Sequence, residues 1–199
     1  KNCYLRVEKG EVVIRCSPLF PQSEIEKLIR NHQEEILEQI KGYVPKYNYQ
    51  EDGYVYLFNQ KYQIVLKDMN IKKCAIHDRQ IYVYSKNIQA TIEMFLKQEL
   101  MNYLKERIDF YLSTSFHHVF PEIQIKKMKR RWGACFYQKN RVCFNLVLAH
   151  IDYALIDYVI VHELCHFLEA NHSKAFYHEI EKRMPDYKER ERLLKDVGI

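Results

Sequence analysis

The sequence has no uninterrupted apolar run long enough to cross a lipid bilayer. A membrane-spanning helix needs about 20 predominantly apolar residues, and the longest apolar-rich stretch, residues 154–168, is interrupted by Asp157, His162, Glu163 and His166. There is also no internal repeat, no low-complexity segment and no stretch typical of a secretory signal peptide. These absences exclude the membrane-embedded and repeat classes, and they predict a cytoplasmic protein without a membrane partner.

Disulfide frameworks and C-x-x-C motifs are absent as well. The six cysteines have no pair at C-x-x-C spacing, and their positions suggest no disulfide pattern. We therefore expect free thiols in a reducing compartment, most of them acting as small buried apolar side chains. The cysteines are Cys3, Cys16, Cys74, Cys135, Cys143 and Cys165.

Charge of one sign is only slightly in excess. Lys and Arg number 31 against 26 Asp and Glu, and the basic residues are scattered except for the cluster at residues 126–131. That cluster could meet nucleic acid or an anionic substrate, although a solvated strand end explains it as well. Hydrophobic residues make up 47% of the chain, which is enough for a core and excludes the disordered class.

The hydrophobic pattern predicts strands in the first half and helices in the second. Period-two or β-branched segments indicate short strands, and apolar residues three and four apart indicate helices. The predicted strands are 12–14, 54–57, 62–66, 80–84, 123–128 and 141–148. The predicted helices are 23–42, 91–117 and a nearly all-apolar helix that Asp152 caps.

This order predicts an α+β fold. We expect an N-terminal β-rich region with one helix over residues 1–88 and a metal-binding catalytic domain over residues 89–199, the two packed as one compact unit. The helix after Asp152 is apolar nearly all round, so it should be central and buried. It also carries the residues with the clearest chemistry.

That helix contains His162-Glu163-Leu164-Cys165-His166, the pattern H-E-x-x-H. Residues four apart lie on one helix face, so both imidazoles can reach one ion. Glu163 projects beside them, where it can take a proton from a water on the metal without being a ligand. Burying these polar groups without a cation would be costly. Neutral imidazole favours zinc, one ion per chain, and another divalent transition metal would also fit.

A catalytic zinc normally has three protein ligands and a water, so a third ligand is needed. His172 follows His166 by six residues, and a continuous helix would turn it about 240° away from the ligand face. The helix must therefore end or bend near Asn171, a residue type that tolerates the left-handed conformation. Glu169 on the same helix and His178 on the next one are the competing third ligands.

Five segments in the second half of the chain resemble a known family in their order. They are Arg131–Cys135, Asn140–Asn145, Ile156–His166, Asn171–Phe176 and Met184–Arg190. This order resembles the YgjP-like metallopeptidase-domain family of bacteria and archaea, whose core is similar to that of the SprT and WLM metalloproteases. The family pattern commonly reads R-W-G-S-C, and Ala134 replaces the serine here. Any role of that hydroxyl is therefore absent.

The resemblance implies that His162, His166 and His172 bind one zinc ion and that Glu163 is the general base. It also implies a minimal zincin-like core, in which a small, mostly antiparallel sheet packs on the long helix and the H-E-x-x-H helix. In zincins an edge strand above the cleft pairs with an extended peptide, and the strand 141–148 is our candidate for that role. Arg131 and Tyr187 are candidate donors to the transition state.

Three functions are compatible with these residues. The foremost is a zinc-dependent hydrolase that acts as a metallopeptidase on a peptide substrate. The second keeps the metal chemistry but hydrolyses a small non-peptide molecule such as a nucleotide. The third is a nucleic-acid-binding module with a structural zinc, which would use the cluster at 126–131 and Trp132. A structural zinc normally has four protein ligands, and Glu163 would then have no task.

Overall fold

The computed structural model describes residues 3–8, 11–42, 47–69 and 71–198. It contains two compact units, residues 1–46 and 47–199. The boundary between residues 88 and 89 that the sequence suggested falls inside the second unit. The reason is that strands from residues 47–84 pack against the helix that begins at Ile88.

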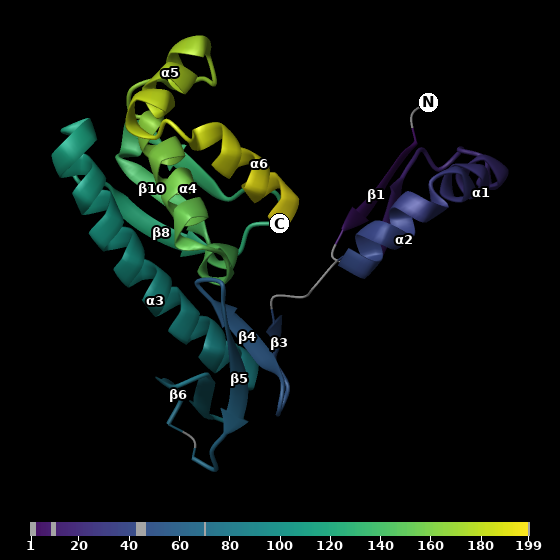
Figure 1. Cartoon of the computed structure of the whole chain (residues 1–199), viewed down its shortest axis with the longest axis horizontal. Helices are drawn as coiled ribbons and strands as arrows, with labels where there is room; N and C mark the ends of the chain where they lie inside the picture. The colour runs from purple at the N-terminus through teal and green to yellow at the C-terminus, as the bar shows by residue number, and fades with distance from the viewer. Residues whose placement is uncertain (1–2, 9–10, 43–46, 70, 199) are drawn as a thin grey trace. The chain divides into compact units, whose positions relative to one another are not determined.

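The first unit contains a hairpin and two short helices, drawn in purple and blue in Figure 1. Strands β1 (Tyr4–Glu8) and β2 (Glu11–Arg15) pair antiparallel, and helices α1 (Gln22–Asn31) and α2 (Gln33–Gly42) follow. The prediction of one helix over 23–42 is wrong. His32 leaves the helical conformation, with φ −113° and ψ 19°, and divides the segment in two.

The second unit begins with a five-stranded sheet in the order β3-β4-β5-β7-β6. Its pairs are antiparallel except for β5 and β7, which run parallel. The strands are β3 (Tyr47–Asn48), β4 (Tyr54–Leu57), β5 (Gln60–Leu66), β6 (Lys73–His77) and β7 (Gln80–Tyr84). None of these strands lines the site described below.

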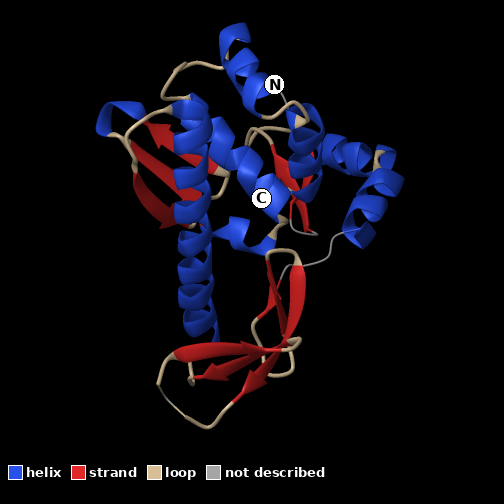
Figure 2. Ribbon diagram, turned by 60° about the vertical axis from the view of Figure 1, so that its left-hand side comes forward, coloured by secondary structure: helices blue, strands red, loops and turns tan. Residues whose placement is uncertain are grey.

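A long helix, α3 (Ile88–Tyr111), connects this sheet to the rest of the unit, as Figure 2 shows. It packs against β6 and β7 and, farther along, against the segments that carry the site. Burying each large apolar side chain of its stripe contributes about 1.5–3 kcal/mol. The fully buried members are Ile92, Leu96, Leu100, Leu104 and Ile108.

The end of α3 differs from the predicted helix over 91–117. The α-helix stops at Tyr111 and continues as one π-helical turn, Leu112–Phe116. His117 then adopts a left-handed conformation with φ 50°, which ends the helix.

A three-stranded sheet follows, in the order β8-β10-β9. Strand β10 (Arg141–Asn145) runs parallel to β8 (Glu122–Lys126) and antiparallel to β9 (Gly133–Phe136). The prediction that the strand 141–148 is an edge strand is therefore wrong. It has neighbours on both sides, and its last residues form a 3-10 turn, Leu146–His150. In the described part of the chain, β9 is an edge of this sheet.

Three helices complete the unit: α4 (Tyr153–Cys165), α5 (Lys174–Arg183) and α6 (Tyr187–Val197). As predicted, the Asp152 side chain caps α4 by accepting from the Ala154 N–H at 2.8 Å. The Ser173 hydroxyl caps α5 in the same way. Helix α4 is buried among α3, β9, α5 and α6.

The predicted α+β class is confirmed, with a small sheet beside a long helix and the H-E-x-x-H helix. Most strand pairs in the described residues are antiparallel, also as expected. The six cysteines are free thiols, and Cys74, Cys143 and Cys165 are buried. Among the described helices, none has both the length and the apolar character that crossing a bilayer would require.

Candidate metal centre and active site

The end of α4 determines where the three histidines lie. The α-helix ends at Cys165, so His162 lies in its last turn and His166 is its C-cap residue. The next residues tighten into turns with bonds such as Leu168 N–H to the Cys165 carbonyl at 2.9 Å. The chain then leaves the helix axis and returns at His172. A change of direction before His172 was expected at Asn171, but it begins six residues earlier, because α4 ends at Cys165.

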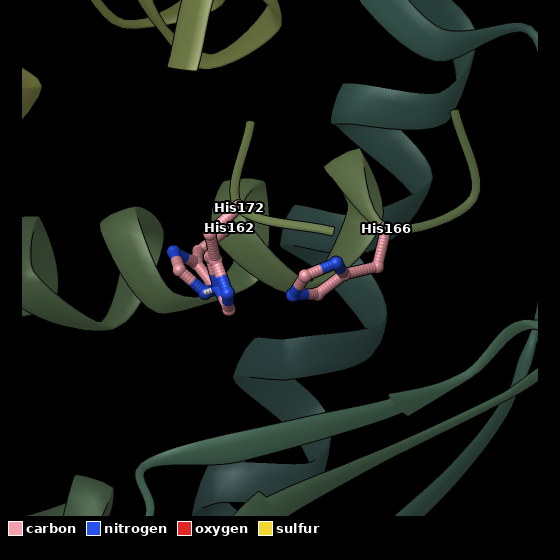
Figure 3. Close-up of side chains that lie close together, drawn as sticks. All are labelled: His162, His166 and His172. Carbon is pink, nitrogen blue, oxygen red and sulfur yellow. Dashed lines mark hydrogen bonds between the residues drawn. The ribbon is translucent and has the colours of Figure 1, made fainter. Parts of the chain in front are cut away.

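His162, His166 and His172 come together at this point, with their rings turned toward a common space (Figure 3). One nitrogen from each ring lies within 4.8 Å of the other two. The Nε2 atoms of His162 and His172 are 3.0 Å apart. Two nitrogen ligands of one tetrahedral zinc ion are separated by about 3.3 Å, so this pair is spaced as ligands of a single ion would be.

The surroundings of His162 and His166 favour neutral imidazole, the form that binds metals. Burial, and next the neighbouring imidazoles, lower the pKa of His162 to about 3. Burial is also the main cause that lowers the pKa of His166. The lone pairs of these rings are therefore not taken up by protons at neutral pH. This donor set fits a divalent transition-metal ion.

Contacts with a backbone carbonyl and with an aromatic side chain hold these imidazole rings in place. The Nδ1 atom of His166 lies 3.2 Å from the Glu169 backbone carbonyl, which selects Nδ1 as the protonated nitrogen and leaves Nε2 free. Phe176 of α5 is fully buried, and its ring contacts all three imidazoles. The ring centroids are 5.0 Å from His162, 4.6 Å from His166 and 4.7 Å from His172. One aromatic side chain therefore supports the whole group.

Glu163 lies beside the histidines and is only 5% exposed. Burial raises the pKa of its carboxyl to about 8, against smaller lowering effects from Arg131 and from the Cys135 backbone N–H that donates to it. A cation beside the carboxyl would favour its ionised form. Glu163 is thus a group whose protonation responds to its surroundings near neutral pH.

Strand β9 passes so close to Glu163 that only glycine fits at one position. A Cβ atom on Gly133 would come within 2.5 Å of the Glu163 Oε1 atom and 2.7 Å of its Cγ atom. The Cys135 N–H lies two residues further along the same strand and donates to the carboxylate. The edge strand β9 therefore positions Glu163 in two ways. Gly133 has no side chain and leaves space for the carboxyl, and the Cys135 N–H donates a hydrogen bond to it.

Buried hydrogen bonds hold the loop that leads into β9. Asn145 is 2% exposed, and its Nδ2 atom donates to the backbone carbonyls of Met128 and Arg131, both at 2.8 Å. Its Oδ1 atom accepts from the Met128 N–H at 3.2 Å, and its own N–H donates to the Trp132 carbonyl at 2.8 Å. Part of the basic cluster at 126–131 is thereby fixed against β10.

The histidines and Glu163 open into a pocket of about 600 Å³. The edge strand β9 and the residues before it form one wall, and helix α6 contributes Glu191, Leu194 and Lys195. Arg131 and Trp132, both singled out in the sequence, line this pocket. The pocket is large enough for several atoms of a peptide or of another organic substrate.

The other residues predicted from the sequence lie apart from this group. Within the described residues, neither Glu169 nor His178 belongs to the metal-binding cluster. The backbone of Glu169 contacts His166, and His178 is exposed on α5. Tyr187, a candidate donor, is buried but does not line the pocket, whereas Arg131 does.

Two residues of the site were missed in the sequence. The contact of Gly133 with Glu163 joins segments that are far apart in sequence, so the sequence pattern gave no signal for it. Tyr158 lines the pocket from α4. Its spacing was a usable signal, because it precedes His162 by four residues and so lies on the same helix face.

The chain is similar to one protein family and to parts of solved structures. Among curated proteins, no sequence matches this chain. Similar solved structures include the metallopeptidase zymogen of Pyrococcus abyssi abylysin, at 17% identity and a TM-score of 0.43. That likeness covers 47% of this chain and 94% of the other. The metallopeptidase zymogen of Methanocaldococcus jannaschii jannalysin is 24% identical with a TM-score of 0.42, covering 47% of this chain and 96% of the other.

A small sheet, a long helix and a helix with two histidines surround one pocket, where three imidazoles could hold a single metal ion. The chain belongs to the YgjP-like family of metallopeptidase domains, whose model matches residues 1–197. Membership of that family makes the protein a metal-dependent peptidase by class, as its sequence resemblance implied.

Proposed function

We propose that the protein is a zinc-dependent peptidase in which His162, His166 and His172 hold the ion and Glu163 is the general base. The observation that carries this proposal is the meeting of three imidazole nitrogens within 4.8 Å of one another beside a buried carboxyl. Imidazole ligands suit zinc among the common divalent ions.

When bound, zinc would acidify a water molecule and polarise the carbonyl group of the scissile bond. Glu163 would accept a proton from that water as its oxygen bonds to the carbonyl carbon, and would pass the proton to the amine nitrogen as the C–N bond breaks. The strand β9 keeps the carboxyl at its place through Gly133 and the Cys135 N–H.

The peptide substrate pairs with β9 in this proposal, not with the strand 141–148 that the sequence suggested. Strand β10 has both of its edges occupied, and β9 is an edge that runs directly beside Glu163. An extended peptide can therefore add to the sheet next to the reacting groups. Arg131, two residues before this strand, lines the same pocket and supplies a positive charge for the substrate.

The test compares wild-type protein with Glu163→Gln on a mixed panel of fluorogenic peptides and casein. The wild-type protein should cleave peptide bonds and lose this activity on chelation. The Glu163→Gln protein should keep about one zinc per chain and lose about 10²–10⁴-fold in kcat, because only the proton acceptor is removed. Glu169→Gln is the matched control, since that side chain is outside the cluster and the pocket. It should retain both zinc and turnover.

The same assay separates the alternative functions. Hydrolysis of nucleoside triphosphates with no cleavage of any peptide would favour a small-molecule hydrolase. Binding to DNA or RNA that survives both Glu163→Gln and zinc removal, without hydrolysis of any kind, would favour a nucleic-acid-binding module. Zinc lost from Glu163→Gln with unchanged turnover would contradict the roles assigned to the four residues.

A further inference from the structure

Tyr158 combines deep burial with a position in the pocket wall. It lies on α4 four residues before His162, and only 4% of its surface is exposed. Its ring meets the His162 ring edge-on, with centroids 5.9 Å apart. The same residue lines the pocket together with His162, His172 and Glu163. The ring is therefore fixed by packing at the site of the proposed reaction.

The hydroxyl of Tyr158 has no hydrogen-bond partner among the described residues. Elsewhere in the described chain every fully enclosed side-chain nitrogen or oxygen has a partner. Because Tyr158 makes no such bond, its oxygen is not fully enclosed by protein, and the residue lines the pocket. The hydroxyl is therefore free to form a hydrogen bond with a polar group that enters the pocket.

We propose that Tyr158 is a catalytic residue whose hydroxyl donates a hydrogen bond to the carbonyl oxygen of the scissile peptide bond as negative charge develops there. The inference rests on the peptidase function proposed above. A donor held by packing toward this position stabilises the charge without reorganising during the reaction. No bond of Tyr158 is formed or broken, and its proton stays on the tyrosine.

Tyr158 suits a donor better than an acid or a nucleophile. Burial, and next the charge of Glu191, raise its pKa far above the ordinary value. The neutral hydroxyl is the form that can donate a hydrogen bond. Its role should therefore appear as a loss of rate without a new step in the pH profile of kcat.

The test is Tyr158→Phe in the zinc-loaded protein, assayed with the fluorogenic peptide that the wild type cleaves fastest. This change removes one oxygen atom and keeps the ring packed against His162. We expect kcat to fall about 100-fold, the usual effect of losing one such donor, with KM within about threefold of wild type. Zinc content and thermal unfolding should stay the same.

Tyr187→Phe is the matched control. Tyr187 is as deeply buried, at 6% exposure, and lies on the neighbouring helix α6, but it does not line the pocket. It should change kcat by no more than about twofold, because removing a hydroxyl away from the reacting groups leaves the transition state unaffected. Equal losses in both variants would mean that packing is the cause and would overturn the role of Tyr158.

A binding measurement separates the transition state from the ground state. A phosphinic peptide, whose anionic tetrahedral centre imitates the developing charge, should bind Tyr158→Phe about 10–100-fold more weakly than wild type. The uncleaved fluorogenic peptide should bind Glu163→Gln with and without Tyr158→Phe at equal affinity. Equal phosphinic affinity in wild type and Tyr158→Phe, or wild-type turnover in Tyr158→Phe, would overturn the proposal.

The outcomes distinguish this proposal from the one on which it rests. A wild-type protein that cleaves no peptide contradicts the peptidase function, and with it a role for Tyr158 in that reaction. A wild-type protein that depends on Glu163 but tolerates Tyr158→Phe leaves the peptidase function standing and removes only Tyr158.

Discussion

The polar side chains on two faces of helix α4 differ in their hydrogen bonding. On the face toward α3, Asp157 accepts hydrogen bonds from the Tyr103 hydroxyl at 2.8 Å, from the Tyr111 hydroxyl at 3.1 Å and from the Arg107 Nη2 atom at 2.7 Å. On the pocket face, the next residue, Tyr158, has no partner among the described residues. Asp157 thus has its hydrogen-bonding capacity filled by protein groups, whereas the adjacent Tyr158 hydroxyl has no protein hydrogen-bond partner in the described residues.

The difference separates stability from function along one helix. A buried carboxylate with every neighbour donating to it ties α4 to α3 and has no capacity left for a ligand. A buried hydroxyl and raised-pKa carboxyl on the other face contribute little to folding and keep their capacity for a ligand. Substitutions on the two faces should therefore change different measurements.

The largest effect is expected at Phe176, which supports the pocket face. Phe176→Ala removes a fully buried ring that contacts all three histidines and should cost about 3–5 kcal/mol in the free energy of unfolding. Zinc affinity should fall about 10–100-fold as the rings lose their support. Urea unfolding of the metal-free protein and zinc competition with a chelating dye measure the two effects.

Ile180→Ala is the control for Phe176→Ala. Ile180 is also fully buried on α5. Its replacement by alanine should lower the free energy of unfolding by about 2–5 kcal/mol, while zinc affinity stays the same. If the two variants lose zinc affinity equally, the rings depend on the fold in general and not on Phe176.

Asp157→Asn tests the opposite face and should have a smaller effect. The amide can accept fewer hydrogen bonds than the carboxylate and leaves Arg107 without its ion pair, which lies at 2.7 Å. We expect a loss of about 2–3 kcal/mol in stability, moderated because Arg107 is partly exposed. Zinc affinity should not change when measured well below the unfolding temperature.

Asp152→Asn makes the same chemical change on the same helix and serves as its control. Asp152 caps α4 through the Ala154 N–H, and asparagine caps helices equally well, so a cost of only a few tenths of a kcal/mol is expected. A similar loss in both variants would show that the charge of α4, and not the contacts of Asp157, stabilises the unit.

The smallest expected effect is in the number of protons released on zinc binding, which should differ by about one between wild type and Glu163→Gln. In the metal-free protein the Glu163 carboxyl, with its pKa raised to about 8, is mostly protonated at pH 7. Its neutral form stabilises the fold most at pH below the ordinary value of 4.5, and that contribution fades as the pH rises through about 8. Zinc binding favours the ionised form and should release this proton.

Calorimetric titration in buffers of different ionisation enthalpy counts the protons. At pH 7 the wild-type protein should release about one proton more than Glu163→Gln on binding zinc, and the difference should vanish above about pH 9. The same proton count in both proteins at pH 7 would contradict a protonated Glu163 in the pocket.

Local features of the fold and site could be predicted from the sequence. The caps at Asp152 and Ser173 and the apolar stripe of α3 depend on neighbours a few residues away. The same holds for His162 and His166, which the helix brings to one face at any position in the fold. The pattern of residue types was therefore sufficient for these.

Features that depend on distant segments were not predicted correctly. Which strand lies at the edge depends on pairing among β8, β9 and β10, and the sequence pattern of the strand 141–148 does not reveal its two partners. A glycine is likewise required at residue 133 only because β9 packs against the Glu163 side chain of α4 in the folded protein. The turn that brings His172 back was placed too late, at Asn171, whereas the helix ends at Cys165.

X-ray absorption at the zinc edge of the purified wild-type protein tests the central claim most directly. The account predicts one zinc per chain with three imidazole nitrogens and one light atom at about 2.0–2.1 Å, and no sulfur. His172→Ala should lose one imidazole from the fit, while Glu163→Gln should leave it unchanged. A shell containing sulfur, four protein ligands, or a spectrum that changes with Glu163→Gln and not with His172→Ala would contradict the account.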